Sequence, residues 1–310
     1  MCFAWALCAI AFVGSSPAPL AARDPDGIRL ASVHAVVGDL ENGEVLYAKR
    51  EEIAVPIASV TKLMTAMVVL DGNQPLDEWI AIVSWSESHG KNRYSRLRVG
   101  SRTTRAQLLR LTLMSSENLA GHVLARHYPG GLDAFIAAMN AKAGALGMSR
   151  THFEDPSGLS VSNRSSAADL WKMANAAYGY DTIREYSITS RYTASFRQPR
   201  YTLSYGNTNP LTASRRWDVA LSKTGYLTEA GRCLVMVADI AGKPVGMVLL
   251  NSFGTRTPLG DASRVRRWLQ TGSSGSIAGA ALEYERRVAA PYDDPERQGV
   301  HESGPQIPNQ

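Results

Sequence analysis

Residues 219–251 read VALSKTGYLTEAGRCLVMVADIAGKPVGMVLLN, and this stretch sets the fold class of the chain. Three β-rich runs, at 219–227, 231–240 and 244–251, are separated by connections that are too short to hold a helix. Consecutive strands joined by such short turns pair antiparallel, so the stretch predicts a three-stranded meander.

A second strand pair is expected near the N-terminus. Residues 31–37 and 44–47 are β-rich and flank an Asn42-Gly43 pair. Asn-Gly is the strongest short hairpin signal, because both residues accept a positive φ. If this hairpin joins the meander, the two units form one five-stranded antiparallel sheet.

The chain between the two strand units has helical patterning. Residues 60–70 are strongly apolar and end at Asp71-Gly72, which predicts a buried helix. Thr104 is placed to cap a helix at 105–114. Further helices are expected at 117–128, 132–146, 166–178 and 258–270. The predicted fold is therefore α+β: a five-stranded antiparallel sheet flanked by helices, with the closing helix on one face and a mostly helical subdomain on the other.

Composition restricts the classes of protein that the chain can belong to. Its 310 residues are 45% apolar and 20% charged, with a net charge of +5. These values are ordinary for a globular protein and exclude wholesale disorder, a collagen-like repeat and a polytopic membrane protein. A pI near 9.1 is weak support for a nucleic-acid partner. Any anionic partner fits equally well, including an acidic cell-wall polymer.

The two ends of the chain differ from its body. Residues 1–22 contain no Asp, Glu, Lys or Arg, and they pass from an apolar run to small residues, as in a secretory signal peptide that lacks the usual basic start. A buried N-terminal helix is the alternative. Cleavage would leave only Cys233, and so no intramolecular disulfide and no cysteine-based metal site. We expect a catalytic domain at 23–272 and a flexible polar tail at 273–310.

One motif offers an activated nucleophile. Ser59-Val60-Thr61-Lys62 opens the apolar helix, and one helical turn places Ser59 and Lys62 on the same face. Burial and the positive helix end would depress the pKa of Lys62, so that it could take the proton of Ser59. The helix N-terminus would also aim backbone N–H groups at a reacting carbonyl. A second Ser-x-x-Lys, at 88–91, lies in a polar stretch with no apolar run after it, and is interpreted as coincidence.

Two further motifs increase the specificity of this interpretation. Ser116-Glu117-Asn118 lies at a helix-to-helix junction, where it supplies a second hydroxyl for proton relay and an amide that can bind a substrate peptide group. Lys223-Thr224-Gly225 lies in the first meander strand, where its side chains can bind a substrate carboxylate and its glycine allows close approach. Motifs for zinc, for phosphate loops and for paired cysteines are missing from the sequence, and His122 and His127 are interpreted as surface or packing residues.

Ser-x-x-Lys, Ser-x-Asn and Lys-Thr-Gly in this order resemble the signature of penicillin-recognising serine enzymes. The resemblance is closest to the D-alanyl-D-alanine endopeptidases of the penicillin-binding protein 7 type, and it covers about residues 31–270. It implies a β-lactamase/transpeptidase-like fold. The residues that carry it are ASVTKLMTAM at 58–67, MSSEN at 114–118, YPGG at 128–131, KTGY at 223–226 and AGRCLV at 230–235.

The resemblance also implies a function and a set of roles. The chain would be a periplasmic serine D,D-endopeptidase that cuts D-alanyl cross-links in peptidoglycan and is acylated by β-lactams. It would need no metal or organic cofactor, no nucleic acid and no stable membrane anchor. The implied catalytic residues are Ser59, Lys62 and Ser116; the substrate-binding residues are Asn118, Lys223, Thr224 and Gly225; and the oxyanion hole is formed by the backbone N–H groups of Ser59 and Tyr226.

Three alternatives remain open. A D-alanyl-D-alanine carboxypeptidase shares the same mechanism, although such enzymes usually carry a second β domain and an amphipathic anchor for which the sequence shows no counterpart. A serine β-lactamase is disfavoured because no Glu-x-x-x-Asn arrangement supplies a deacylating carboxylate. A peptidoglycan-binding scaffold without activity is disfavoured because all the catalytic positions are intact.

Overall fold

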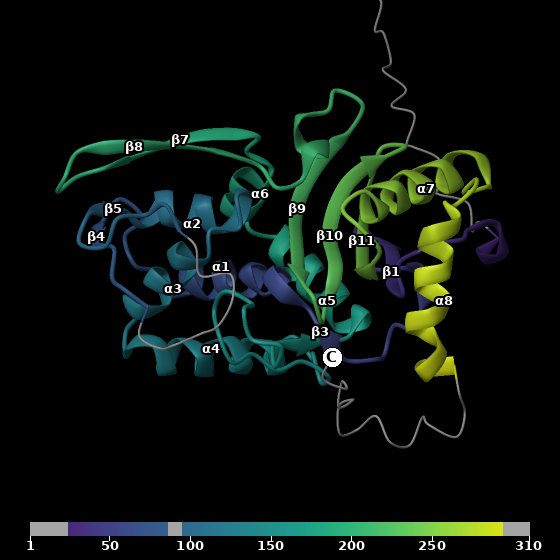
Figure 1. Cartoon of the computed structure of the whole chain (residues 1–310), viewed down its shortest axis with the longest axis horizontal. Helices are drawn as coiled ribbons and strands as arrows, with labels where there is room; N and C mark the ends of the chain where they lie inside the picture. The colour runs from purple at the N-terminus through teal and green to yellow at the C-terminus, as the bar shows by residue number, and fades with distance from the viewer. Residues whose placement is uncertain (1–23, 86–94, 294–310) are drawn as a thin grey trace, which may run out of the picture.

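The computed structural model describes residues 24–85 and 95–293, and it is built around one antiparallel sheet (Figure 1). The five strands lie in the order β2-β1-β11-β10-β9, so the N-terminal hairpin joins the C-terminal meander as predicted. The strands are β1 (His34–Asp39), β2 (Val45–Lys49), β9 (Asp218–Leu227), β10 (Gly231–Ile240) and β11 (Lys243–Ser252).

The sheet has an apolar core on each face, because successive side chains of a strand point to opposite sides. Val235 of β10 belongs to the core that the sheet shares with the helical cluster, whereas its neighbour Leu234 belongs to the core beneath the closing helix. The register aligns Val36 with Val248, Val248 with Val235, and Val235 with Lys223. Lys223 therefore shares a row with core residues that face the helical cluster.

Helices cover both faces of the sheet. In Figure 1, α1 to α4 lie to the left of the sheet, and α7 and α8 lie to the right. Thr104 caps α2 by accepting a hydrogen bond from the backbone N–H of Gln107. The helices are α1 (Lys62–Asp71), α2 (Arg105–Met114), α3 (Asn118–Arg126), α4 (Gly131–Ala145), α5 (Ala167–Tyr178), α6 (Asp181–Ile188), α7 (Thr257–Thr271) and α8 (Gly279–Asp293).

Three pairs of short strands lie outside the main sheet. Each is antiparallel and two-stranded. The sequence analysis predicts none of them, nor α6, because each depends on partners distant in the sequence: Val55 pairs with Ser165, and Trp79 pairs with Thr104. The pairs are β3 (Val55–Pro56) with β6 (Arg164–Ser165), β4 (Trp79–Ala81) with β5 (Arg102–Thr104), and β7 (Arg191–Phe196) with β8 (Tyr201–Gly206).

The segment after α7 differs from the predicted flexible tail. Residues Gly279–Asp293 form α8, which buries Ala281 and Ala289. Arg50 donates to both carboxylate oxygens of Asp293, at 2.7 and 2.6 Å, and to Glu285 at 2.9 Å. Composition alone suggested disorder, because the segment has few large apolar residues, but these long-range ion pairs fix it against the body. Residues 279–293 are therefore helical and packed against the body, whereas composition alone favoured a flexible segment.

Three sequence predictions lie outside the described residues: the signal peptide at 1–22, the second Ser-x-x-Lys at 88–91 and the part of the flexible tail at 294–310. Among the helices that the structure describes, none combines the length and the apolar character needed to cross a bilayer.

Candidate active site

Ser59 lies on a 3₁₀ turn, η2 (Ala58–Thr61), that runs directly into α1. The sequence analysis predicted one continuous helix here, whereas the structure places Ser59 in the tighter turn and begins the α-helix at Lys62. The Nζ atom of Lys62 donates to Ser59 Oγ at 2.8 Å. Ala58, immediately before the serine, has a φ of +48°, a strained conformation that is typical of functional turns.

The lysine amine is fully buried and has three acceptors. Besides Ser59, Lys62 Nζ donates to Asn118 Oδ1 at 2.7 Å and to the backbone carbonyl of Ser157. Burial lowers the pKa of Lys62 to about 7, while the charges of Asp155 and Glu117 act in the opposite direction. A substantial neutral fraction exists near pH 7, so the amine can accept a proton from the serine that it contacts.

The second hydroxyl comes from the junction between α2 and α3. Ser116 has a φ of +58°, which turns the chain sharply between the two helices. Lys223 Nζ donates to Ser116 Oγ at 3.0 Å, so the second and third motifs meet directly. Asn118 begins α3, and Glu117 caps that helix by accepting a hydrogen bond from the backbone N–H of Leu119. Burial raises the pKa of Glu117.

Strand β9 brings the third motif to the nucleophile. Lys223 is buried, and burial together with the nearby charge of Lys62 holds its pKa well below the usual range. Thr224 donates to Thr208 Oγ1 at 2.7 Å. A Cβ atom on Gly225 would lie 3.1 Å from the backbone N of Ser59 and 3.1 Å from the carbonyl oxygen of Ile57. Glycine therefore lets the strand approach the serine turn closely.

The loop at 155–160, which begins with the turn-forming sequence Asp-Pro-Ser-Gly, completes the site. The Asp155 carboxylate accepts hydrogen bonds from the backbone N–H groups of Ser157, Gly158 and Ser160, at 2.6 to 2.7 Å. These bonds shape the loop so that the carbonyl of Ser157 meets Lys62. The Asp-Pro-Ser-Gly sequence contains the signal for such an Asx turn, but the sequence does not show what the loop contacts.

Asn163 ties this loop to the serine turn. Its Oδ1 accepts from the backbone N–H of Glu154 at 2.8 Å, and its Nδ2 donates to Thr61 Oγ1 at 3.1 Å. Gly158, with a φ of +76°, lies so close to the same turn that a Cβ atom on it would be 2.0 Å from Ala58 O. Both residues hold Ser59 in place, and neither was singled out by the sequence analysis.

A cleft of about 580 Å³ opens beside Ser59. It has a positive rim because Arg232 and Arg256 line it, and Arg232 stacks 3.9 Å from the ring centroid of Tyr226. The sequence analysis gave neither arginine a role. The predicted site residues that line the cleft are Ser59, Ser116, Asn118, Thr224, Gly225 and Tyr226. Lys62 and Lys223 lie buried behind them and contact Ser59 and Ser116.

His122 and His127 do not line the cleft beside Ser59. His122 is buried in α3 and its ring lies 4.9 Å from that of Trp85, while His127 bonds the carbonyl of Val123 at 3.0 Å. Within residues 24–85 and 95–293, no group of three or more His, Cys, Asp and Glu side chains could hold a metal ion. The chemistry that this arrangement offers is attack by an activated serine on an acyl group, with two hydroxyls and two buried amines to move the proton.

Known proteins resemble the chain over most of its length. A family model described as D-alanyl-D-alanine carboxypeptidase matches residues 20–254. A Pseudomonas aeruginosa protein named D-alanyl-D-alanine endopeptidase is 48% identical over 272 residues, covering 88% of this chain and 87% of that protein. An Escherichia coli protein of the same name is 45% identical over 278 residues, covering 90% and 89%. The crystal structure of a Streptomyces DD-transpeptidase has a TM-score of 0.73 and 31% identity, covering 78% of this chain and 98% of that one.

Proposed function

Because the chain belongs to the D-alanyl-D-alanine carboxypeptidase family of serine peptidases, we propose that it is a D,D-endopeptidase that hydrolyses D-alanyl cross-links in peptidoglycan. The observation that carries this proposal is the contact of Ser59 Oγ with a buried lysine whose pKa is lowered to about 7. The endopeptidase activity, rather than carboxypeptidase activity, is supported by the names of the two relatives that cover most of the chain.

The acylation step follows from the contact between the Ser59 and Lys62 side chains. Ser59 Oγ attacks the carbonyl carbon of the D-alanyl bond, and its proton passes to Lys62 Nζ. The backbone N–H groups of Ser59 and Tyr226 would bind the oxyanion. Each donor would stabilise the transition state by about 3 kcal/mol. The C–N bond then breaks, and the leaving amine receives the proton through Ser116. Water hydrolyses the acyl-enzyme by the reverse sequence of proton transfers.

Substrate binding is assigned to the side chains around the cleft. Asn118 would hold the substrate peptide group, since its amide nitrogen can donate while its Oδ1 accepts from Lys62. Lys223 and Thr224 would bind the substrate carboxylate, and Gly225 would allow the substrate backbone to lie along β9. Arg256 lines the same cleft and supplies a fixed positive charge.

The location and the inhibitors follow from the same assignment. The enzyme would act in the periplasm after removal of residues 1–22, with a catalytic domain at 23–272. A β-lactam mimics the D-alanyl carbonyl and carboxylate, and it would acylate Ser59 and remain bound. The positive rim formed by Arg232 and Arg256 suits a wall polymer that carries carboxylates.

The test is chromatography of purified muropeptides after incubation with the enzyme and with Ser59→Ala. We expect the wild type to convert cross-linked dimers to monomers, and we expect Ser59→Ala to leave the dimers intact. Conversion of pentapeptides to tetrapeptides with intact dimers would assign the chain as a carboxypeptidase. Binding to sacculi without any hydrolysis would assign it as a scaffold, and full activity of Ser59→Ala would refute the serine mechanism.

A further inference from the structure

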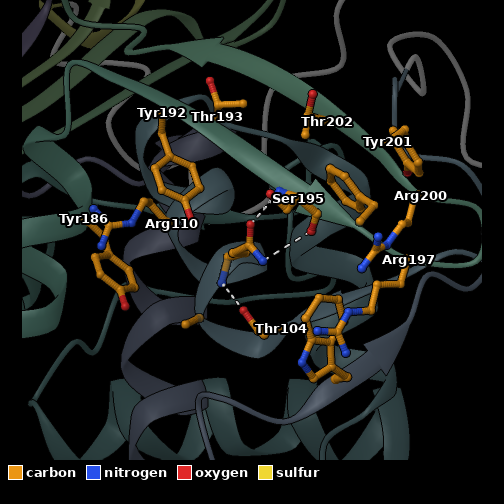
Figure 2. Close-up of a pocket in the computed structure, with 14 residues that line it drawn as sticks. Thr104, Arg110, Tyr186, Tyr192, Thr193, Ser195, Arg197, Arg200, Tyr201 and Thr202 are labelled. Atoms are coloured by element: carbon orange, nitrogen blue, oxygen red, sulfur yellow. Dashed lines mark hydrogen bonds between the residues drawn. The ribbon is translucent and has the colours of Figure 1, made fainter.

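A second pocket lies apart from the catalytic cleft, between the β7–β8 hairpin and the N-terminal half of α2. We call it the hairpin pocket; it has a volume of about 790 Å³ and is larger than the cleft beside Ser59. Figure 2 shows Arg110 against Tyr186 at one side of it, and Arg197 and Arg200 at the other. Neither the motifs nor the proposed mechanism uses this pocket.

Hydrogen bonds between the two walls of the hairpin pocket fix the hairpin against α2 and β5. Gln107 of α2 accepts from the backbone N–H of Ser195 at 2.7 Å and donates to the carbonyl of the same residue at 3.3 Å (Figure 2). Thr103 also donates to Ser195 O, at 2.9 Å. Arg102 and Arg197 exchange two backbone hydrogen bonds, at 2.8 and 2.9 Å. A ligand would therefore meet a preformed cavity and would not have to order the hairpin.

The lining combines guanidinium groups with aromatic rings. Arg197 stacks 3.8 Å from the ring centroid of Trp79, and Arg110 stacks 3.9 Å from that of Tyr186. Arg110 is neutralised by Glu185, at 2.7 Å. Among the described residues, no carboxylate forms an ion pair with Arg197 or Arg200, although both side chains are exposed. Two guanidinium forks are thus available, and a guanidinium fork matches a carboxylate.

The sequence segments that contribute the walls are rich in arginine, and three of these arginines, Arg110, Arg197 and Arg200, line the pocket. Residues 95–114 contain five arginines and no Asp or Glu. Residues 186–217, which include the hairpin, also contain five arginines and no Asp or Glu. Arg105 and Arg110 are paired with Glu78 and Glu185, so the positive charge that remains at the pocket comes from Arg197 and Arg200, and it attracts anionic ligands.

The hairpin pocket is connected to the catalytic cleft by two continuous elements. Helix α2 runs from the pocket to Met114, two residues before Ser116, and Arg110 lies about 6 Å along the helix axis from Met114. Strand β8 leads from the pocket to Thr208, whose backbone N–H donates to Met114 O at 2.9 Å. Thr208 also accepts from Thr224 in the cleft. Because a strand advances about 3.3 Å per residue, the six residues of β8 separate Arg200 from the cleft end of the hairpin by about 20 Å, so only a polymeric substrate could occupy the hairpin pocket and the cleft together.

We propose that the hairpin pocket binds a carboxylate-bearing peptide stem of the wall polymer, outside the D-alanyl bond that is cut. This proposal rests on the proposed function, which supplies the polymer. The aromatic rings would pack against the aliphatic parts of the stem, while Arg197 and Arg200 pair with its carboxylates. The pocket would hold a part of the substrate that lies away from the reacting carbonyl, and would thereby favour polymeric over small substrates.

The experiment is a calorimetric titration at low salt with a peptidoglycan stem tripeptide that lacks D-alanine. A second titration uses the same tripeptide with its carboxylates amidated. We expect the free tripeptide to bind and the double variant Arg197→Gln/Arg200→Gln to weaken that binding about tenfold. Arg286→Gln/Arg287→Gln removes the same charge from two exposed arginines of α8 and should leave binding unchanged.

The titration experiment also includes a variant that keeps the positive charge, and a β-lactam that occupies the catalytic cleft. Arg197→Lys/Arg200→Lys should bind with an intermediate affinity, since lysine keeps the charge but loses the planar fork. Addition of a saturating β-lactam should not displace the tripeptide. Displacement would place the tripeptide in the catalytic cleft and would overturn the proposal.

Three other outcomes would also overturn the proposal. The free and amidated tripeptides could bind equally well, or the arginine variants of the pocket and of α8 could lose equal amounts of affinity. An oligonucleotide could also bind more tightly than the tripeptide. The proposed function is tested separately, by measuring the mass of the protein after incubation with the β-lactam. If no adduct forms on Ser59, the endopeptidase assignment fails, and the comparison of variants still decides whether the pocket binds the stem.

Discussion

The rate of Ser59 acylation should depend on pH through the protonation of Lys62. Burial lowers the pKa of Lys62 to about 7, and only the neutral amine can take the serine proton. With this pKa, the neutral fraction is about 1% at about pH 5 and about 90% at about pH 8, so the rate should rise roughly 90-fold and then level off. A lysine with its ordinary pKa would give a tenfold rise per pH unit, on the order of 1,000-fold over the same range, without a plateau.

The assay is stopped-flow acylation by a chromogenic β-lactam, with the second-order rate constant followed from acid to mildly alkaline pH. Glu117→Gln tests the electrostatic cause, because the charge of Glu117 raises the pKa of Lys62 while glutamine can still cap α3. This variant should move the inflection to lower pH. Glu283→Gln, on the exposed face of α8, serves as the matched control and should leave the inflection in place.

Two results would refute this reasoning. A rate that climbs tenfold per pH unit without a plateau would mean that Lys62 keeps an ordinary pKa despite its burial. An inflection that does not move in Glu117→Gln would mean that the carboxylate exerts no field on the lysine. The first result would remove Lys62 as the base that acts near neutral pH, and the second would remove Glu117 as a cause of its pKa.

Three further changes test the site and its supports. Ser116→Ala should lower the acylation rate constant by about 10²-fold or more, measured with the same β-lactam, because the proton relay loses its hydroxyl. Gly158→Ala should lower the free energy of unfolding by about 3 kcal/mol in urea titrations, whereas Gly147→Ala, with a φ of +67° but no close neighbour, should cost about 1 kcal/mol. Arg50→Gln should cost about 1–2 kcal/mol by releasing α8, and Arg150→Gln, which removes one exposed ion pair, about 0.5 kcal/mol or less.

Each of these changes has an outcome that contradicts its premise. An unchanged acylation rate constant in Ser116→Ala would mean that another group protonates the leaving amine. Equal costs for the two glycine variants would mean that the close approach to Ala58 is relieved without strain. Equal costs for the two arginine variants would mean that α8 contributes no more to stability than an isolated surface pair.

Local patterns were sufficient to predict the main architecture. Alternating and β-branched residues at 219–251, the Asn42-Gly43 turn and the cap at Thr104 each act over a few residues, and the structure confirms the five strands and the capped helix. The hairpin β7–β8 and helix α8 could not be predicted in the same way. Both are held by partners distant in the sequence: Gln107 holds the hairpin, and Arg50 holds α8.

The sequence by itself determined the chemical components of the site, because Ser-x-x-Lys, Ser-x-Asn and Lys-Thr-Gly specify side chains and their order. It also predicted the direction of the shift in the pKa of Lys62, since an apolar helix implies burial. Tertiary structure decided which groups meet. The contact of Lys223 with Ser116 joins residues that are 107 positions apart. The carbonyl of Ser157 reaches Lys62 through a loop that Asp155 shapes. Such contacts depend on how the sheet and the helical cluster pack, and no local pattern encodes that packing.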